Sequence, residues 1–566
     1  MSIFGSIQMA GNTLQAMQIG LHVVGNNIAN ANTPDYVRER VLYTPAPVMK
    51  LGDLTLGLGV EIAGVVQNID RFVEERLRGV GGDRASANVQ EKVYRDLESI
   101  LGELSDTDVS TSLTQFFNSI EEVVNHPEDM ALRNLAAQAG ITLSTRINTL
   151  SRRVNTVYEE FGQGVDNLSA EINTLTEQVR KLNLQIVSLE GGNPTANEAG
   201  GLRSQRSVAL KRLSEIADVK IAENQVGAVS LSLDGELIVF EGTRREVKTE
   251  FSSEGGLSKA NIVFADNGST MQVNGGELHG IYEARDRIVG GFIERLDNFA
   301  AALAFEFNKV YSQGQGATGF KTITSVDAVD SPSAALDAAG LAFTPVNGEF
   351  NVVLQNTKTG LTNTTIINVD LIGLLDDSTL ASIAAEIDAI SGVTASVTAD
   401  NRLNIQSESE ETVIAFDKDT SGLLAALGIN TFFTGSKASD IGINGVVAAD
   451  GSKFAASNVG KVGVGIGNAQ KLVALHDEGL TSLNGSSITG IYDQLINETA
   501  QGATVAGSIA DGFEVFEQTL EAQFQSVSGV NLDEEAIDMI MLQRTYQASA
   551  RYISTLSELM DVLVAL

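Results

Sequence analysis

The N-terminal stretch IFGSIQMAGNTLQAMQIGLHVVGNNIANANTP, residues 3–34, carries an apolar residue at every third or fourth position. The spacings of 4, 3, 4, 3, 4, 3 and 4 residues form the a/d pattern of a helix with one narrow apolar seam. This pattern predicts an α-helix that packs against a partner helix. The seam residues are Ile3, Ile7, Ala10, Leu14, Met17, Leu21, Val24 and Ile28.

The same stretch contains no acidic side chain, no lysine and no arginine. Asp35 is the first charged residue of a chain that has 72 acidic and 38 basic residues. Uncharged polar side chains can be buried against neighbouring subunits without the desolvation of a charge, so the stretch suits the interior of a polymer. Helix propensity falls at the asparagines, and Thr33-Pro34 is expected to stop the helix.

The C-terminus repeats the pattern, with one polar interruption at Ser549. The preceding SGVNLDEE predicts a helix start, because Asn531 or Asp533 can cap the helix and the acidic residues complement its dipole. Nothing local covers either stripe, so the two ends are expected to pair with each other or with copies of themselves. The C-terminal seam residues are Met539, Leu542, Tyr546, Ile553, Leu556, Met560 and Leu563.

Spacing alone leaves two interpretations of these seams open. One is an intramolecular coiled coil that only holds the chain closed, and the other is an assembly surface. The missing charges favour assembly. A single narrow seam with several glycines makes a marginal helix pair in water, so we expect the terminal helices to be poorly ordered in the monomer and to fold on assembly.

Three further apolar sets at helical spacing lie between the termini. The longest runs from Ile147 to Leu189 with a change of phase at Gly162 and Gly164, and predicts a helix of about 60 Å at ~1.5 Å per residue. The second runs from Val289 to Val310. The third comprises Ile509, Phe513, Phe516, Leu520 and Phe524. Together they predict a helical rod or bundle.

The period changes from helical to alternating in two places. VSLSLDGELIVF turns at Asp234-Gly235 and predicts a hairpin, and NIVFADNGSTMQV repeats that device. Residues 340–445 add further strands around one short helix at 378–391. The predicted fold class is α+β, multi-domain and elongated. The predicted domains are a terminal coiled coil (1–45 with 528–566), a helical rod domain (46–217 with 276–324 and 451–527), a small β-rich insert (218–275) and an outer β-rich insert (325–450).

Composition limits the partners. A net charge of −34 disfavours binding to nucleic acid or to an anionic membrane surface, because both are polyanions. The chain has no cysteine, which excludes disulfides and thiolate chemistry. A cleavable signal peptide is not expected, since no basic residue opens the N-terminus. No apolar run approaches the length of a membrane span.

The chain offers no recognisable catalytic or cofactor site. Its four histidines, His22, His126, His279 and His476, lack metal-ligand spacing. DKDTSG at 417–422 imitates the start of a calcium loop but has glycine at the twelfth position, so it is interpreted as a turn. GVGIGNAQK at 463–471 matches no phosphate-binding motif and is interpreted as a flexible connection. We therefore expect no enzyme, no cofactor and no metal.

The N-terminal motif resembles a known signature. The residues Gly25, Asn26, Asn27, Ile28, Asn30, Asn32, Thr33 and Pro34 are similar to the motif shared by axial proteins of the bacterial flagellum. Within that group the chain resembles the flagellar hook-associated protein 1 family, the first junction proteins between hook and filament. The matching stretches include GLGVEI at 57–62, residues 113–139, 172–186, 276–314, 427–444 and 528–566.

This resemblance implies a layout and a set of partners. The terminal helices would form an inner coiled-coil domain, and the β inserts would project outward. The implied partners are further copies in a ring, hook protein, the second junction protein (hook-associated protein 3) and a cytoplasmic export chaperone on the C-terminal helix. The implied location is the hook–filament junction, reached by type III export from the cytoplasm with an uncleaved N-terminal signal.

Two alternatives remain open at this stage. The chain could be another axial protein, such as hook protein or hook-associated protein 3. The long 147–189 helix and LGINTFFTGS at 427–436 argue against a hook or rod protein. It could also be a secreted adhesin or enzyme with coiled-coil ends, but no ligand or catalytic cluster is recognisable in residues 325–450.

Overall fold

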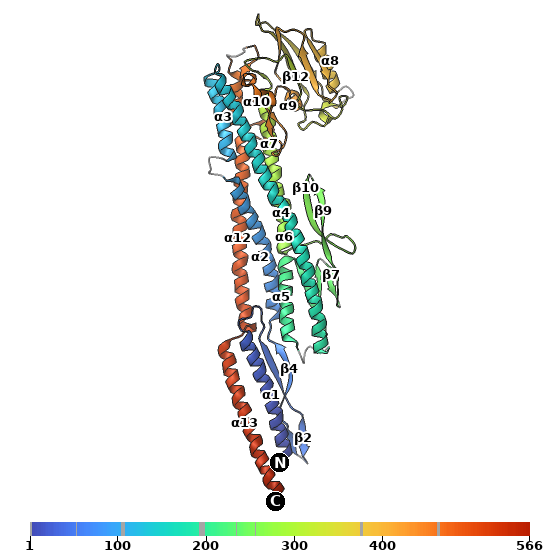
Figure 1. The fold of residues 1–566 in the computed structure, drawn as a ribbon, viewed down its shortest axis with the longest axis vertical. Helices are drawn as coiled ribbons and strands as arrows, with labels where there is room; N and C mark the ends of the chain where they lie inside the picture. Colours follow the sequence, from blue (N-terminus) through green and yellow to red (C-terminus); the bar gives the residue numbers. More distant parts are fainter. Residues whose placement is uncertain are drawn as a thin grey trace. The chain divides into compact units, whose positions relative to one another are not determined.

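The computed structural model describes residues 3–51, 54–102, 108–191, 198–233, 235–240, 242–254, 256–373, 377–460 and 465–565. It divides into two units, one formed by residues 1–92, 159–285 and 504–566 and the other by residues 93–158 and 286–503. Helices alternate with small antiparallel sheets in both units (Figure 1). The fold class is therefore α+β, as the sequence predicts.

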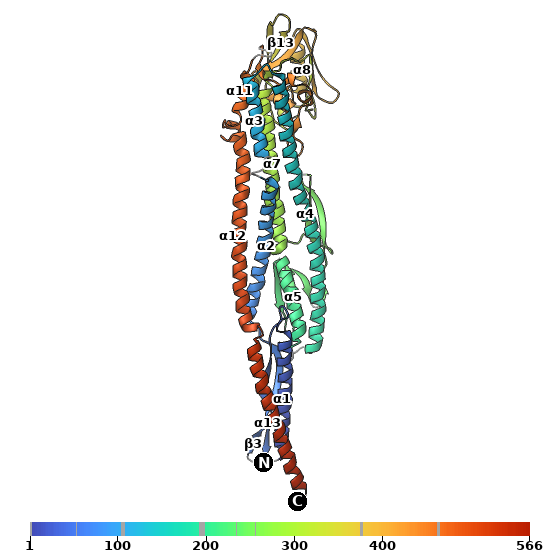
Figure 2. The ribbon, with the colours of Figure 1, turned by 60° about the vertical axis from the view of Figure 1, so that its left-hand side comes forward.

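The chain termini of the first unit lie side by side in helices α1 (Ile3–Asn30) and α13 (Leu532–Ala565), as Figures 1 and 2 both show. Strands β1 (Glu39–Pro45) and β4 (Val60–Gln67) form an antiparallel ladder that packs against α1. Its register pairs Glu39 with Gln67 and shifts between Leu42 and Tyr43. A hairpin of β2 (Val48–Leu51) and β3 (Leu54–Gly57) extends this layer.

Helix α1 continues through Asn26 and Asn27 and ends at Asn30, just before the predicted stop at Thr33-Pro34. The asparagines do not break it because their side chains find partners. Asn27 bonds the backbone of Glu39 at 2.9 and 3.0 Å, and Asn30 Nδ2 donates to the carbonyl of Asn26 at 3.0 Å. Tertiary contacts thus outweigh low helix propensity. Asp35 then adopts a φ of 56°, which completes the turn.

The start of α13 agrees with its predicted cap. Asn531 directly precedes the helix, and its Oδ1 accepts a hydrogen bond from the backbone N–H of Asp533 at 3.0 Å. Three acidic residues, Asp533, Glu534 and Glu535, occupy the first turn. There they complement the positive end of the helix dipole.

The rest of the first unit combines helices with a small β region. Its elements are the first part of α2 (Arg71–Leu101), the second part of α4 (Met130–Glu190), α5 (Gly200–Ile216), α6 (Gly276–Glu283) and the second part of α12 (Ile488–Ser528). The strands are β5 (Val219–Glu223), β6 (Val229–Leu233), β7 (Glu236–Phe240), β8 (Thr243–Arg244), β9 (Val247–Glu254) and β10 (Leu257–Phe264). Asn173 and Asn183 on α4 bond the backbones of Val247 and Val229, which attaches the strands to the helix.

The predicted hairpin at Asp234-Gly235 is present as β6 and β7, although Asp234 itself lies outside the described residues. The second predicted hairpin is only partly formed. β10 pairs with β9, and the chain after Gly268 returns through a single bridge between Val263 and Thr270 instead of a strand. Two backbone hydrogen bonds, from Phe264 N–H to Ser269 O and from Met271 N–H to Ile262 O, both at 2.9 Å, hold this second arm against β10.

The second unit contains a helical part with α3 (Val109–Asn125), the first parts of α4 and α12, the end of α2, α7 (Gly290–Tyr311) and α11 (Gly467–Ala474). A π-helix at Ala284–Val289 precedes α7. The apolar set predicted from Val289 to Val310 is buried except for the half-buried Val310, with Val289 at the end of the π-helix and the others along α7. Phe116, Phe307, Tyr311, Phe432 and Phe433 form a cluster in which the centroids of contacting rings are 4.9–5.9 Å apart. The helix α11 corrects the prediction of a flexible connection at 463–471, of which residues 463–464 lie outside the described residues.

Two three-stranded sheets form the β-rich part of the second unit. One has the order β12-β16-β15 and the other β14-β13-β17. Their core includes Phe350, Ile383, Ile405 and Phe416, each at most 1% exposed. The strands and helices are β11 (Gly314–Gln315), β12 (Thr322–Thr324), β13 (Gly348–Asn356), β14 (Thr362–Val369), α8 (Leu380–Asp388), β15 (Val393–Val397), β16 (Leu403–Ser407), β17 (Thr412–Asp417), α9 (Leu423–Leu427), β18 (Phe433–Thr434), β19 (Gly442–Ile443), α10 (Gly445–Ala449) and β20 (Ser457–Asn458).

The apparent calcium loop at 417–422 is a turn, as predicted. Asp419 accepts hydrogen bonds from the backbone N–H groups of Ser421, Gly422 and Leu424 at 2.8–3.0 Å. Its carboxylate therefore supports the start of α9 and is occupied by backbone donors.

Three predicted seam positions are corrected. Leu189 is 69% exposed at the end of α4. The next residue, Glu190, is buried and forms an ion pair with Arg203. Ile509 and Phe516 on α12 are 48% and 40% exposed, whereas Leu520 and Phe524 of the same set are buried. The helical period identifies which residues share an apolar face. How much of that face is buried depends on the neighbouring elements that pack against it.

Candidate functional site

The terminal-helix layer, which we define as residues 3–67 together with 532–565, is the first candidate site. The structure brings both predicted seams together, since α1 and α13 lie alongside each other. Burial along the seams is uneven. Ala10, Met17, Val24 and Leu556 are buried, and Tyr546 is 38% exposed. Half-buried are Ile3, Ile7, Leu14, Leu21, Ile28, Met539, Leu542, Ile553 and Met560. The side chain of Leu563 lies outside the described residues.

At Gly20, side chains of both α13 and β1 lie close to the backbone of α1. A Cβ atom on this residue would lie 2.5 Å from the Tyr43 hydroxyl oxygen and 3.2 Å from Leu542 Cδ1. The absence of a side chain at Gly20 lets the Tyr43 hydroxyl and the Leu542 side chain pack against the backbone of α1, and a methyl group there would require both side chains to move. Gly11 and Gly25 have no neighbouring atom within 4 Å of the same position.

A polar network anchors the start of α13 to the chain that follows α1. Arg38 pairs with Glu534 at 3.1 Å, with Glu535 at 2.6 Å and with Asp538 at 3.5 Å. Glu535 is 1% exposed and also accepts from Asn27 Nδ2 at 3.1 Å. The backbone N–H of Arg38 donates to the carbonyl of Ser528 at 2.9 Å. These bonds fix where α13 begins relative to α1.

The motif residue Asn27 is the centre of that network. Its Oδ1 accepts from the Tyr36 hydroxyl at 3.0 Å and from the Glu39 N–H at 3.0 Å. Burial raises the pKa of the Tyr36 phenol, and the nearby carboxylates of Glu39 and Glu535 raise it further. The pKa of Glu39 is also raised, mainly by burial, although a hydrogen bond from Asn26 opposes the shift. Tyr36 therefore stays a neutral donor to Asn27.

The sequence pattern missed Gly20, Arg38, Tyr43 and Glu535. A signal for one contact was present, because YVRER follows the asparagine motif and DEE opens the C-terminal helix. Opposite charges at the two ends of the chain are consistent with contact. Their pairing could not be derived, since nothing local relates residues 497 positions apart.

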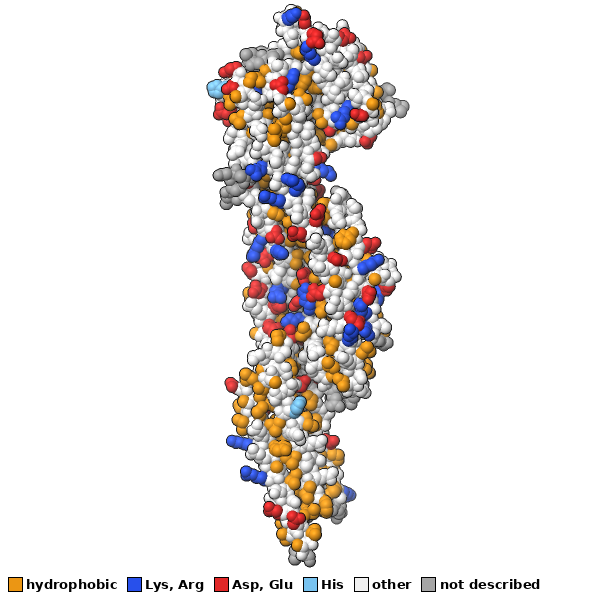
Figure 3. All heavy atoms as spheres, in the orientation of Figure 1, with side chains coloured by type: hydrophobic (Ala, Val, Ile, Leu, Met, Phe, Trp, Pro, Cys, Tyr) orange, Lys and Arg blue, Asp and Glu red, His pale blue; other side chains and the backbone are white. Residues whose placement is uncertain are grey.

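A second apolar face of α13 remains exposed, and we call it the outer stripe. Its residues are Ile537 (66% exposed), Met541 (57%), Tyr552 (42%), Leu559 (52%) and Val562 (59%). They recur at combinations of three- and four-residue steps and lie on a different face from the seam. Hydrophobic side chains are also visible over α1 and α13 in the space-filling view (Figure 3). Such a stripe is typical of a surface that another chain covers.

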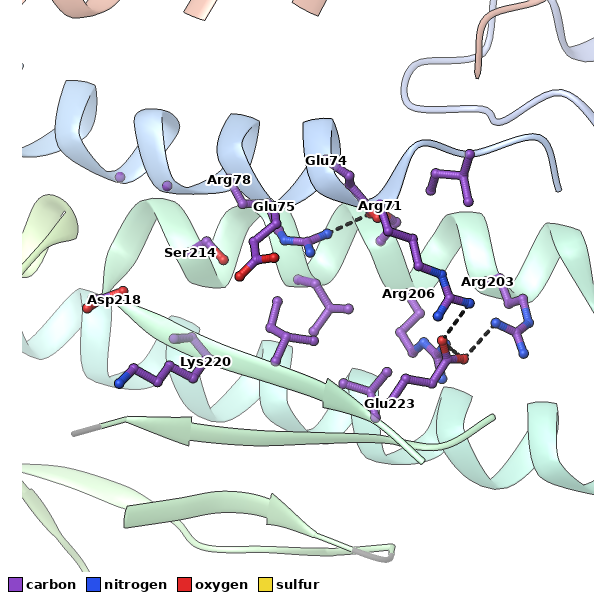
Figure 4. A pocket seen from close by; sticks show the side chains of 18 of the residues that line it. Arg71, Glu74, Glu75, Arg78, Arg203, Arg206, Ser214, Asp218, Lys220 and Glu223 are labelled. Atoms are coloured by element: carbon purple, nitrogen blue, oxygen red, sulfur yellow. Dashed lines mark hydrogen bonds and ion pairs between the residues drawn. The ribbon is translucent and has the colours of Figure 1, made fainter. Parts of the chain in front are cut away.

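The second candidate site is a cavity of about 740 Å³ in the first unit, between α2, α5 and β5. Figure 4 shows Arg71, Arg203 and Arg206 converging on Glu223. The ion-pair distances to the Glu223 carboxylate are 3.0, 2.7 and 3.3 Å, respectively. Arg203 also pairs with Glu190 at 2.7 Å.

The charged side chains of this cavity form ion pairs with one another. Burial acts to raise the pKa of Glu190, but hydrogen bonds from Arg203 and the Ala199 N–H outweigh it, so the pKa lies below its ordinary value. Burial lowers the pKa of Arg206, while Glu223 opposes the shift. With each buried guanidinium held by carboxylates or carbonyls, the cluster joins α4, α5 and β5 and is interpreted as structural.

The described residues show no group of three or more His, Asp and Glu side chains placed to hold a metal ion. His279 lies 3.3 Å from Ser86 Oγ, and His476 pairs with Asp477 at 2.8 Å. Among the helices in the described part of the chain, none is long and apolar enough to cross a membrane.

Comparisons with known proteins agree with the motif. The chain matches the family model described as "Flagellar hook-associated protein FlgK helical domain" over residues 94–323. Residues 7–36 match "Flagella basal body rod protein", and residues 521–566 match "Flagellar basal body rod FlgEFG protein C-terminal". The two terminal matches cover most of α1 and all of α13.

Curated relatives carry one name. Flagellar hook-associated protein 1 of Escherichia coli K12 is 23% identical, with 99% of both chains covered. The protein of the same name from Salmonella typhimurium LT2 is also 23% identical over 99% of both chains. That of Bacillus subtilis 168 is 26% identical over 56% of this chain and 69% of its own length.

A solved structure, that of the flagellar hook junction protein FlgK from Burkholderia pseudomallei, has a TM-score of 0.49 at 15% identity and covers 80% of this chain and 100% of the other. At this score it adds nothing to the assignment, which rests on the family models and the full-length relatives. Their matches agree from the asparagine motif to the C-terminal helix. The chain is thus similar to flagellar hook-associated protein 1 over nearly its whole length, and its residues 94–323 match the helical-domain model of that family.

Proposed function

We propose that the protein is a structural component of the bacterial flagellum and forms the first junction between hook and filament. One observation carries this proposal, namely the terminal-helix layer with its uncovered outer stripe on α13. The similarity to flagellar hook-associated protein 1 supports the same function. It does not favour another axial protein, or a secreted adhesin or enzyme, over the hook-associated protein.

One chain covers only part of the apolar surface of the terminal-helix layer. In the described part of the chain, most seam residues between α1 and α13 are buried or half-buried, whereas the outer stripe is exposed. The polar positions of α1 carry no Asp, Glu, Lys or Arg, so neighbouring subunits could bury them without desolvating full charges. Copies arranged in a ring would cover the outer stripe and complete the layer.

The seam and the outer stripe would thus have different roles. Ile3 to Ile28 and Met539 to Leu563 would hold the two helices of one subunit together, and the outer stripe would join subunits. We propose hook protein and hook-associated protein 3 as the neighbours on either side of the ring. The similarity to flagellar proteins supports assembly with other flagellar components.

Before assembly the outer stripe needs protection, and we propose that an export chaperone binds α13 in the cytoplasm. The protein would then pass through the type III apparatus unfolded, with an uncleaved N-terminal signal. The absence of cysteine suits this route, since no disulfide can hinder threading. The family consists of structural flagellar proteins, and we propose that this chain has no enzymatic activity and no cofactor.

The first experiment locates the protein. Intact flagella would be treated with an antibody against residues 325–450 and examined by immunogold electron microscopy. A single narrow band of gold where hook meets filament is expected. Label along the whole curved hook would instead indicate a hook protein, and flagella without label would reject the proposal.

The second experiment separates assembly from simple closure of the chain. Leu14→Asp or Leu21→Asp places a charge in the half-buried seam. We expect filament growth to stop, with the unfolding transition of the remaining domains unchanged. Normal filaments in either variant would contradict the assembly proposal. A lowered unfolding temperature of the whole monomer would favour the interpretation that the seam only closes the chain.

A further inference from the structure

A cleft of about 1080 Å³ in the second unit belongs to neither site described above. We call it the β12 cleft. Strand β12 and the segment 317–321 line one side of it, with Phe320 in that segment. Val413 and Gln355 contribute from β17 and β13, and Val446 and Val447 from α10.

Strand β12 presents an unused hydrogen-bonding edge. It is the edge strand of the β12-β16-β15 sheet. The N–H of Ser407 donates to Lys321 O at 2.8 Å, and the N–H of Ser325 donates to Leu403 O at 2.8 Å. Because hydrogen-bonded pairs alternate in an antiparallel ladder, the backbone groups of Thr322 and Thr324 point away from β16. Within the described chain these outward N–H and C=O groups have no partner.

The edge is paired only at its start. Phe320 O accepts from the N–H of Ile414 on β17 at 2.7 Å, and the two strands share no further bridge within the described residues. Beyond Phe320, the outward-pointing N–H and C=O groups of Thr322 and Thr324 remain, two residues apart. An extended polypeptide has the same repeat, so it could continue the ladder along β12.

The charge of the cleft is opposite to that of the protein. The described residues that line it include two lysines, Lys321 and Lys453, and neither aspartate nor glutamate. The whole chain has 72 acidic residues and a net charge of −34. An anionic ligand would therefore meet locally favourable charge in a molecule that otherwise repels it.

Lys453 differs from Lys321 in that its ammonium group contacts a backbone carbonyl oxygen and has no carboxylate partner in the described structure. Its half-buried Nζ donates to Gly319 O at 2.7 Å and lies 4.8 Å from the centre of the Phe320 ring. Burial lowers its pKa, and Asp450 opposes the shift. No carboxylate in the described structure lies within ion-pair distance of Nζ. Lys321 pairs with Glu410, whose side chain is 89% exposed, and such a pair is weak and easily exchanged.

We propose that the β12 cleft binds an extended, acidic polypeptide segment of a partner protein by strand addition. The segment would bond the outward backbone groups of Thr322 and Thr324, and its carboxylates would pair with Lys453 and Lys321. The backbone edge favours a polypeptide over an acidic sugar, since a sugar lacks the regular donor–acceptor repeat. This proposal does not depend on the flagellar function.

The test uses the full chain and a fluorescein-labelled, end-blocked peptide of sequence TVEVTVEVT, followed by fluorescence anisotropy. We expect saturable binding. Replacing both glutamates of the peptide by lysine should weaken binding by about tenfold or more, as should N-methylation of its central backbone amides, because each change removes interactions of at least ~1.4 kcal/mol. Hydrogen exchange at residues 317–326 should slow when the peptide is bound.

Variants of the protein locate the site. Thr322→Pro removes the outward N–H and is expected to lower affinity about tenfold, while the control Thr322→Val keeps the N–H and should bind normally. Lys453→Met should reduce the preference for glutamate, and Lys453→Met combined with Lys321→Met should abolish it. If Thr322→Pro fails to fold, the N-methylated peptide still tests the backbone edge.

Three results would overturn the proposal. They are no saturable binding of the acidic peptide, equal binding of the acidic and lysine peptides, and binding that Thr322→Pro and N-methylation leave unchanged while the variant is folded. Binding of an oligogalacturonate in the cleft with none of the peptide would likewise reject it and identify an acidic-sugar site.

Discussion

The terminal-helix layer and the β-rich part of the second unit use apolar residues in opposite ways. On α8, the core residues Leu380, Ile383 and Ile387 are each 0% exposed. On α13, Leu556 is buried, whereas Ile537 and Val562 of the outer stripe are 66% and 59% exposed. The β-rich part completes its core within one chain. The terminal-helix layer does not, which is the behaviour expected of a surface that other subunits complete.

The largest effect is expected from charges on the outer stripe. Met541→Asp combined with Leu559→Asp should abolish incorporation into flagella, because each carboxylate would be buried unpaired between subunits. The free energy of unfolding of the monomer should change by no more than about 0.5 kcal/mol per site, since both residues are exposed. Motility assays and urea unfolding would measure the two effects.

A matched control places the same charges on exposed polar positions of α13, with Gln543→Asp and Gln547→Asp. This control should assemble if the outer stripe is the interface. Failure of the control and the stripe variant alike would show that added charge, and not its position, blocks assembly.

The next largest effect concerns the completed core. Phe416→Ala removes a ring that is 0% exposed and should lower the free energy of unfolding of the β-rich part by about 3–5 kcal/mol. Ile366→Ala, on β14 at the other edge of the same three-stranded sheet, affects a residue that is 55% exposed and should change it by less than about 0.5 kcal/mol. Urea denaturation followed by circular dichroism would distinguish them, and similar losses in both would refute the comparison.

A smaller effect is expected where Gly20 of α1 contacts Tyr43 and Leu542. Gly20→Ala introduces a methyl group 2.5 Å from the Tyr43 hydroxyl oxygen, so the exposed Tyr43 ring and the Leu542 side chain must shift, at a cost of about 1 kcal/mol. Hydrogen exchange in α13 should accelerate. In Gly11→Ala the new methyl meets no atom within 4 Å, and its higher helix propensity should stabilise α1 by up to about 1 kcal/mol. Equal behaviour of the two variants would exclude a special role for Gly20.

The smallest effect is a pH dependence in the arginine cavity. Burial acts to raise the pKa of Glu190, but Arg203 and the Ala199 N–H outweigh it and hold the pKa below its ordinary value of 4.5. A group with a lowered folded pKa stabilises the protein above its unfolded pKa, and that stability is lost as pH falls through the folded value. Urea midpoints at pH 7 and at acidic pH should therefore differ more in the native protein than in Glu190→Gln. Parallel pH profiles would exclude this contribution.

Local pattern predicted the helices better than their contacts. The three- and four-residue spacing located both terminal helices, and alternation located the hairpin at Asp234-Gly235. The helical spacing wrongly predicted burial for Leu189, Ile509 and Phe516. They have the right spacing but are exposed, because no neighbour in the described chain covers them. A helical period reports which residues share a face. It contains no information on where the packing partner ends.

The sequence by itself determined the α+β class, the two terminal seams and the caps that begin α13, because these depend on periods and residue types within a few turns. Only the tertiary structure decided that Arg38 meets Glu535, that Gly20 admits Tyr43 and Leu542, and that the edge of β12 stays open beside two lysines. Those features join residues far apart in the chain. They depend on how distant segments pack together in the folded chain, and a local sequence pattern contains no information on that packing.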